Sequence, residues 1–250
     1  VDLGPKGAVF RMPPECGNGR DNLTNPHNKQ SKMCRAYLAL YRVTGKDEYF
    51  RRALKLGTRF KRTLRLDGDH YLWNYWEPAG EWDQKPDKPG EWKHWIGPEH
   101  RGGYHALTVA MAEALYDHGV LFDRTDMQRF VNTQMQVCWN GSLENPVFVT
   151  TGGQPAKEPG HATIMAPALA RFEPKIWEFC YGERAARERL QAREHNWSGG
   201  VGAMEYLLEK YVNKRGVEPT RTRFRDQFLA RAENAAFLQS LDARVGAGGR

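Results

Sequence analysis

Two polar clusters interrupt the otherwise helical pattern of this sequence. The clusters are Asn25-Pro26-His27-Asn28 and His94-Trp95 followed by Glu99-His100-Arg101-Gly102-Gly103-Tyr104-His105. His100 and Tyr104 are four residues apart and Arg101 comes three residues before Tyr104, so a helix would place all three on one face. One bound substrate can then contact all three side chains.

This trio has the functional groups that β-elimination on a uronate requires. A base removes the proton from C5, an acid protonates the glycosidic oxygen at C4, and a cation or hydrogen-bond donor stabilises the charge that develops at the carboxylate. A tyrosine with its ordinary pKa of about 10 is a weak base at neutral pH, but a neighbouring guanidinium and imidazolium favour the phenolate. Arg101 and His100 are placed to do this for Tyr104.

Each of these residues also has an ordinary structural explanation. Tyr104 opens the apolar stripe of its predicted helix, so a core tyrosine with a satisfied hydroxyl explains it equally well. Asn25 is fully explained as a helix N-cap, and His100 as a hydrogen-bond partner of a loop carbonyl. His27 alone indicates nothing, and Asn28 is compatible with simple solvation.

An aromatic run beside the clusters adds candidates for sugar binding. Aromatic faces stack on sugar rings, although most aromatic side chains serve packing alone. Crowding beside polar residues favours binding for the group as a whole. The candidate catalytic residues are Tyr104, His100, Arg101 and Asn28, and the candidate substrate-binding residues are Asn25, His27, Trp73, Asn74, Tyr75, Trp76, His94, Trp95 and Glu99.

Helical periodicity predicts the elements that position these residues. A first helix begins at Asn25-Pro26, as N-cap and first helical residue, and ends at Thr44-Gly45. A second amphipathic helix, from Tyr49 to Leu64, completes an antiparallel hairpin. A third is expected from Pro98 to about His118 and a fourth, short one over Asp123–Val137.

The remaining segments are predicted from composition and turn residues. A short strand is expected over Tyr71–Trp76, and a long aromatic loop that packs over another part of the molecule over Glu77–Gly97. Loops with a helical turn around Ala166–Phe172 are expected between Trp139 and Pro174. Further predictions are helices over Pro174–Arg193, Gly200–Lys214 and Thr220–Ala243, an irregular lead-in over 1–23 and a loose tail over 244–250.

Length and composition favour one domain over 1–250 that is surrounded by water. The chain has 250 residues with 40% hydrophobic content, enough for one core. Its mean hydropathy is -0.73, and it lacks the run of about 18 apolar residues that a membrane span needs. The net charge of +7 and the pI near 9.2 favour polyanions, but charge does not choose between nucleic acid, anionic lipid and acidic glycan.

The cysteines do not predict a metal site. Cys16, Cys34, Cys138 and Cys180 have no CxxC spacing and no clustered histidines, so we expect buried thiols or at most one or two disulfides. The opening residues have neither a basic n-region nor an apolar h-region. Any signal peptide has therefore been removed or lies outside this chain.

Several motifs together resemble the toroidal polysaccharide lyases that act on alginate or glucuronan, and polysaccharide lyase family thirty-eight is the nearest match. They are Asn25–Asn28, the hairpin Ala39–Gly45, Trp73–Trp76 and Glu99–Tyr104, and the resemblance covers about residues 20–182. It implies an all-α fold, an α/α toroid or incomplete barrel of antiparallel helix hairpins, with a short β-hairpin and long aromatic loops.

The resemblance also implies a site and its surroundings. An Asn/His/Arg group that neutralises a carboxylate and a Tyr or His acid/base pair map onto Asn28, His100, Arg101 and Tyr104. No metal or other cofactor is implied. An acidic polysaccharide is the expected partner, without nucleic acid or membrane, and the expected location is periplasmic or secreted.

A complete toroid has more helices than this sequence predicts, so we expect a fragment or a reduced version. The alternatives are a glycoside hydrolase that uses Glu99 with Glu77 or Asp83, a uronyl epimerase on the same scaffold, and a non-catalytic glycan-binding protein. The uronic acid, endo or exo action and the oligomeric state stay open.

Overall fold

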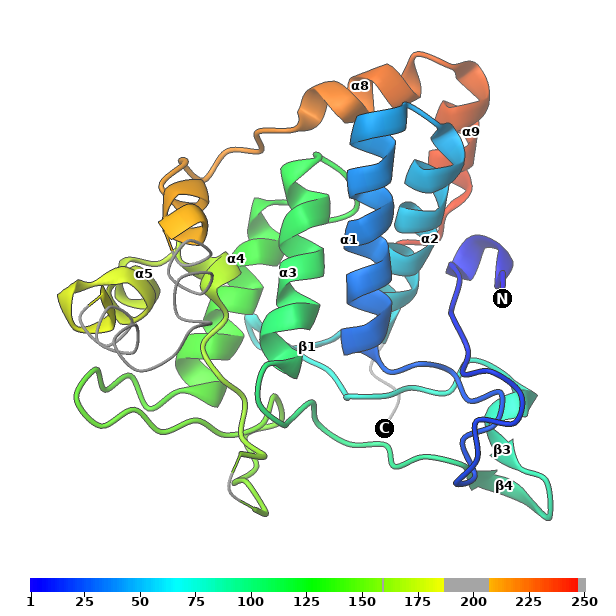
Figure 1. Cartoon of the computed structure of the whole chain (residues 1–250), viewed down its shortest axis with the longest axis horizontal. Coiled ribbons are helices and arrows are strands. Elements are labelled where there is room, and N and C mark those ends of the chain that lie inside the picture. The colour runs from blue at the N-terminus through cyan, green and yellow to red at the C-terminus, as the bar shows by residue number, and fades with distance from the viewer. Residues whose placement is uncertain (159, 187–206, 247–250) are drawn as a thin grey trace, which may run out of the picture.

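Helices dominate the computed structural model, which describes residues 1–158, 160–186 and 207–246 (Figure 1). Two small antiparallel sheets accompany them. The predominantly helical character predicted from the sequence is therefore confirmed, with about 48% of the residues in helices. Among the described residues, none of the helices has both the length and the apolar character needed to cross a bilayer.

The first two long helices form the predicted antiparallel hairpin. α1 (His27–Thr44) ends at Gly45, which has a φ of 66° and donates its N–H to the Tyr41 carbonyl. Glycine adopts this left-handed backbone conformation most easily, because it has no Cβ atom, and it often ends a helix for that reason. α2 (Asp47–Thr63) then runs back along α1.

The predicted start of α1 is corrected by one position. Pro26, not Asn25, is the N-cap, and its neighbour Asn25 donates its backbone N–H to the Phe10 carbonyl. Asn25 is thereby held to the lead-in segment, which contains the short helix η1 (Gly4–Lys6) and isolated bridges such as Arg11 with Thr24. Its side chain does not cap the helix.

α3 (Tyr104–Asp117) lies beside α1, and the N-terminal ends of both helices are at the lower end of the molecule in Figure 1. The predicted third helix was expected to begin at Pro98, which is wrong by six residues. Residues 98–103 are instead an extended loop, because Arg101 and Gly102 donate their backbone N–H groups to the carbonyls of His161 and Ala162. The end near His118 is confirmed.

The fourth helix changes its winding along its length. α4 (Arg124–Asn132) begins with a capping box between Asp123 and Asp126. It continues as the π-helix η3 (Thr133–Cys138). The predicted extent of 123–137 is confirmed, and the π-helical end, which widens the turn, was not predicted.

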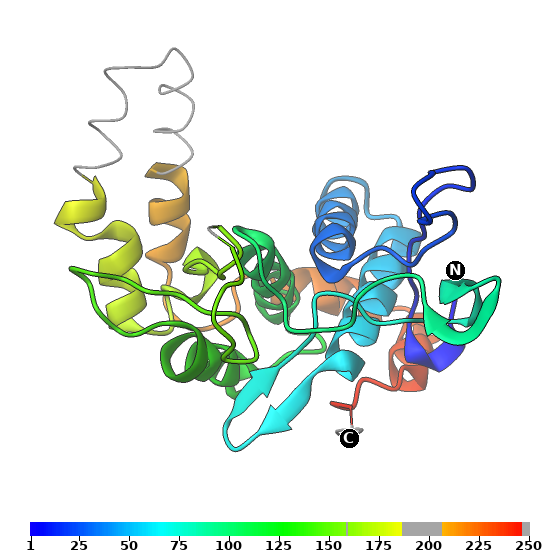
Figure 2. The same ribbon diagram turned by 90° about the horizontal axis from the view of Figure 1, so that it is seen from below.

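Strands are shorter than expected around the aromatic run. β1 (Arg65–Asp67) pairs with β2 (His70–Leu72), so the predicted strand at 71–76 is a named strand only at its start, and it continues as an isolated bridge between Asn74 and Pro98. The loop that follows carries the short helix η2 (Glu81–Asp83) and a second hairpin of β3 (Gln84–Lys85) and β4 (Lys88–Trp92). In Figure 2 this loop, teal to green, crosses beneath the ends of α1 and α3.

The C-terminal part is built from short helices. The predicted turn is η4 (Pro167–Leu169), followed by α5 (Pro174–Tyr181), and residues 183–186 and 207–213 are helical. The remainder of the helices predicted over 174–193 and 200–214, and the tail from 247, lie outside the described residues.

The single helix predicted over 220–243 is two helices, α8 (Thr222–Leu229) and α9 (Ala232–Ser240). The chain turns at Arg231, which is extended and pairs with Asp47 at the start of α2. Asn234 donates to the same carboxylate at 2.7 Å. These bonds fold α9 back against α2, and Figure 1 shows α8 across the upper ends of α1 and α2.

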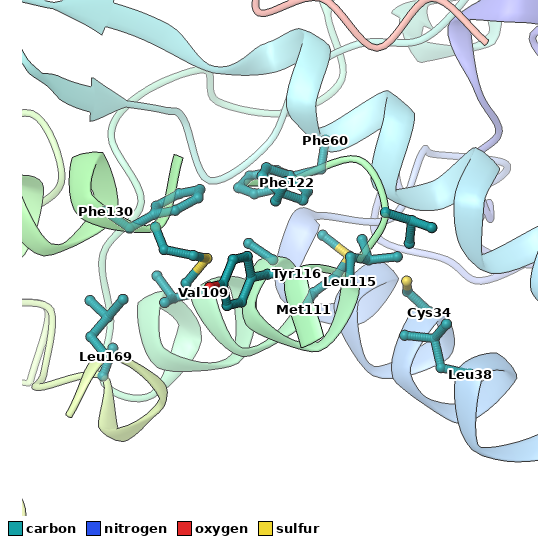
Figure 3. Packing of buried hydrophobic residues seen from close by; sticks show 14 of the residues in the cluster. Cys34, Leu38, Phe60, Val109, Met111, Leu115, Tyr116, Phe122, Phe130 and Leu169 are labelled. Carbon is teal, nitrogen blue, oxygen red and sulfur yellow. The ribbon is translucent and has the colours of Figure 1, made fainter. Parts of the chain in front are cut away.

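A cluster of buried hydrophobic side chains packs α1, α2, α3 and α4 together. Figure 3 shows Phe60 of α2, Phe122 and Phe130 gathered above α3, with Met111 and Leu115 facing them. Cys34 and Cys138 are buried free thiols, one of the two states predicted for the cysteines from the sequence. Burial raises the pKa of the Cys138 thiol to about 12. Cys16 is exposed and forms no disulfide within the described parts of the chain.

Candidate active site

A pocket of about 340 Å³ opens where the N-terminal ends of α1 and α3 meet the aromatic loop. Six residues predicted from the sequence line it: Tyr75, His94, Trp95, His100, Arg101 and Tyr104. The lining is completed by residues that the sequence did not single out: Met12, Arg20, Leu23, Pro26 and Lys29. Segments from the lead-in, α1, the aromatic loop and α3 therefore meet at one place.

Two stacked phenol rings form one wall of this pocket. The ring centroids of Tyr75 and Tyr104 are 5.4 Å apart and the ring planes differ by 17°. Burial, and secondarily the neighbouring Tyr104, raises the pKa of Tyr75 to about 12. Tyr75 is therefore a neutral phenol at physiological pH and can donate a hydrogen bond from its hydroxyl group.

His100 lies between aromatic rings. Its ring centroid is 5.0 Å from that of Trp95 and 5.9 Å from that of Tyr75. Burial lowers the pKa of His100, and the ring of His161, 5.4 Å away, lowers it further. At neutral pH His100 is thus a neutral imidazole, whereas the sequence hypothesis relied on an imidazolium.

Arg101 is held in an unusual backbone conformation beside the pocket. Its φ is 75°, and that of Gly102 is 58°. For a residue with a side chain this region costs roughly 1–3 kcal/mol and persists only when the surroundings impose it. Here the hydrogen bonds to His161 and Ala162, 3.0 and 3.1 Å long, impose it. The exposed Arg101 side chain is thereby presented to the pocket.

The pocket is electropositive. Arg20, Lys29 and Arg101 line it, and among the described residues that line it none is acidic. Within the described chain these three cations form no ion pair. The N-terminal ends of α1 and α3, which side chains leave uncapped in this part of the structure, add partial positive charge. An anionic group is the complementary ligand.

Glu99 and Trp73 lie behind the pocket rather than in it. Both are fully buried. The Trp73 Nε1 donates to Glu99 Oε2 at 2.5 Å, and Thr108 Oγ1 donates to Oε1 at 2.9 Å. Burial raises the pKa of Glu99 to about 8. Since both oxygens have internal partners, Glu99 anchors the loop that carries His100 and does not reach a ligand in the pocket.

The polar cluster Asn25–Asn28 contributes fewer side chains to the pocket than the sequence predicted. His27 is buried with its Nε2 3.3 Å from Thr63 Oγ1, and burial lowers its pKa to about 3. The buried Oδ1 atoms of Asn25 and Asn28 have no hydrogen-bond partner among the described residues. None of these three lines the pocket, and the cluster supplies Pro26 and the following Lys29 instead.

Trp76 and Asn74 support the pocket from outside. Trp76 is fully buried, donates its Nε1 to the Thr24 carbonyl at 2.8 Å and stacks on His94 with centroids 5.5 Å apart. Asn74 donates its Nδ2 to Glu77 at 2.5 Å. Both therefore hold the loop that carries Tyr75 and His94, and neither is available to stack on a sugar.

A smaller pocket of about 260 Å³ adjoins the first across His100 and Trp95, which line both. Lys157 and His161 line it from the 150–161 loop. Sequence reasoning missed His161 and Arg20 because both stand in irregular segments, where no periodicity indicates which way a side chain faces. The positive charge of Arg20 was its only signal in the sequence, and many surface residues share it.

Comparison with known proteins adds no assignment. No protein-family model, curated protein or solved structure matches this chain. In the described residues no group of three or more His, Cys, Asp or Glu side chains is arranged to hold a metal ion. Chemically, the pocket combines two phenols, a neutral imidazole and unpaired cations, a set suited to proton transfer on an anionic substrate.

Proposed function

We propose that the chain is a polysaccharide lyase that cleaves a uronate-containing glycan, of the alginate or glucuronan kind, by β-elimination in the pocket around Tyr104. The observation that supports this most directly is the position of Tyr104. Its ring forms a wall of an open pocket that contains three unpaired cations and, among the described lining residues, no carboxylate.

The proposed step uses this chain's own residues. Arg101 and Lys29 bind the substrate carboxylate and Tyr75 donates a hydrogen bond to it. The Tyr104 phenolate removes the proton from C5, and the electron pair of the C–H bond forms the C4=C5 double bond. The C4–O bond breaks, and the leaving oxygen takes a proton from the Tyr104 hydroxyl. The products are an unsaturated uronate and a free hydroxyl, so no cofactor is consumed.

His100 completes this proposal as a neutral imidazole. Its lowered pKa leaves it uncharged at neutral pH, so it accepts or donates a hydrogen bond without adding charge. The positive charge of the pocket comes from Arg20, Lys29 and Arg101 instead.

We also propose that the helix hairpin belongs to an α/α toroid. The antiparallel α1–α2 pair has the geometry of one repeat unit, and α3 runs beside α1 in the position of the next helix. In such an arrangement the loops at one end of the helices carry the site, as the aromatic loop does at the lower end in Figure 1.

The hydrolase alternative has less support. A carboxylate pair would need both groups in the pocket, but Glu99 is buried with two internal partners. Asp83 is also buried, and its carboxylate accepts from the Thr24 backbone and hydroxyl at 2.8 and 2.7 Å. Glu77 is bonded to Asn74.

The test is incubation with alginate, glucuronan, pectate and glycosaminoglycans, followed by the ultraviolet absorbance of the unsaturated product. We expect absorbance to rise with at least one polyuronate and the rate to fall by about 10²- to 10⁴-fold in Tyr104→Phe. Tyr49→Phe, in a half-buried tyrosine outside the pocket, is the matched control and should keep its rate. Absence of absorbance on every polymer, or binding without turnover that Tyr104→Phe leaves unchanged, would refute the lyase.

A further inference from the structure

A second and larger hollow begins beside the pocket around Tyr104, with α1 and α3 on one side and residues of 164–168, 179–185 and 209–215 on the other. It has a volume of about 1210 Å³ and is lined along its floor by small residues from both helices, Ala36, Ala39, Ala106 and Ala110. Gly103 lines this groove while the next residue, Tyr104, lines the pocket. Lys32 of the groove follows Lys29 of the pocket by one helical turn. The two hollows therefore adjoin at two points.

Cations follow α1 along the whole groove. Lys32, Arg35 and Arg42 line it, and none of them forms an ion pair with another described residue. Together with Lys29 they extend over fourteen residues of helix, from Lys29 to Arg42, which corresponds to about 20 Å. Burial, together with the nearby Arg221, lowers the pKa of Arg42, whereas the charge of Asp117 acts in the opposite direction.

The acidic residues of the groove are already engaged. Glu113 accepts from Arg171 at 3.0 Å and also pairs with Arg215. Glu209, on the opposite wall, interacts with Tyr181. The charge of Glu113 is therefore compensated within the protein, whereas Glu209 interacts with a neutral phenol. The cations of α1 face the groove.

We infer that this groove binds the continuation of an anionic polysaccharide whose uronate is held at Tyr104. The inference rests on the proposed function for the identity of the polymer. A floor of alanines leaves room for a chain of sugar rings, and a row of separated cations matches carboxylates that recur along a polymer. A length of about 20 Å exceeds a disaccharide, so the groove selects long chains and favours cleavage inside them over removal of terminal units.

The test compares long and short ligands in the Tyr104→Phe background, in which binding is measured without turnover. Isothermal titration uses polyglucuronate or alginate and the corresponding disaccharides. We expect Lys32→Glu with Arg35→Glu to weaken polymer binding by about tenfold and disaccharide binding by less than about twofold. Lys6→Glu with Lys88→Glu makes the same change of charge at two exposed residues outside the groove and should alter neither. Thermal melts of all variants establish that they fold.

The remaining outcomes of this experiment distinguish the polymer-binding groove from the proposed lyase activity. Equal weakening of polymer and disaccharide binding, or no weakening of either, overturns the proposal that the groove binds the polymer. If the wild type then still cleaves polyuronate, the lyase stands without it. Polymer binding that depends on Lys32 and Arg35 in a protein without cleavage supports the groove and refutes the lyase. Tighter binding of a single-stranded oligonucleotide than of any polyuronate overturns the polysaccharide as its occupant.

Discussion

Tyr75 and Tyr104 stack with their ring centroids 5.4 Å apart, although they come from different elements. Tyr75 lies in the segment that leads from β2 into the aromatic loop, whereas Tyr104 is the first residue of α3. Their contact joins the loop to the helix at the wall of the pocket. The orientation of the proposed base is thus set by a residue whose own pKa, raised to about 12, keeps it a neutral phenol.

Two substitutions of Tyr75 distinguish the role of its ring, which stacks on Tyr104, from the role of its hydroxyl group, which donates a hydrogen bond. Tyr75→Ala removes the ring against which Tyr104 packs, and we expect kcat on a polyuronate to fall by at least about tenfold because the base loses its orientation. Tyr75→Phe keeps the stack and loses one hydrogen bond, which costs about 0.5–1.5 kcal/mol, so it should mainly raise KM. Steady-state kinetics checks this, and equal effects of the two substitutions would contradict it.

His161 tunes His100 through charge. Burial and the neighbouring His161 both lower the pKa of His100. His161→Gln removes the second cause, so the pKa of His100 should rise towards its ordinary value. NMR titration of the imidazole resonances measures this directly. The acid limb of the pH profile of kcat/KM should move to higher pH in the same variant, and an unchanged His100 titration would refute the coupling.

Glu99 makes stability depend on pH in the direction opposite to most carboxylates. Its pKa is raised from 4.5 to about 8 in the folded state, so folding favours the neutral acid. That contribution is complete below about pH 4.5 and is lost as the pH rises towards 8, because the unfolded chain ionises first.

Glu99→Gln should remove this dependence. Relative to the variant, the wild type should lose on the order of a few kcal/mol of unfolding free energy between pH 5 and pH 8. Urea unfolding of both proteins across this range provides the measurement. Parallel curves for the two proteins would mean that Glu99 keeps an ordinary pKa.

Arg171 binds the C-terminal segment to α3. Its side chain is fully buried and donates to Glu113 at 3.0 Å, Asp117 at 3.2 Å and the carbonyls of Val217 and Glu218. Arg171→Met leaves two buried carboxylates with one cation fewer, and we expect a loss of about 3–5 kcal/mol.

An exposed ion pair of the same region is the matched control for this substitution. Arg124 lies 3.4 Å from Glu218, and both side chains are more than two-thirds exposed. Arg124→Met should therefore cost less than about 1 kcal/mol. Urea unfolding measures both variants, and similar losses would show that burial does not decide the strength of these pairs.

The sequence by itself determined the helix hairpin and the presence of reactive residues near one end of it. The apolar period of 27–63 is local, and it fixes α1 and α2 because the hydrogen bonds of an α-helix join residues four apart in the chain. The cluster His100-Arg101-Tyr104 was also visible locally, and all three residues line one pocket.

Tertiary structure decided how these residues are presented. The loop at 98–103 bonds to residues 161–163, a pairing across about sixty positions that no local period encodes, and it replaced the expected first turns of α3. Glu99 and Trp73 are buried against each other, so neither of these two predicted substrate-binding residues reaches the pocket. Arg20 and Lys29 reached the pocket only because the lead-in and α1 fold over the aromatic loop, since charge marks a residue in the sequence but does not say what it will face.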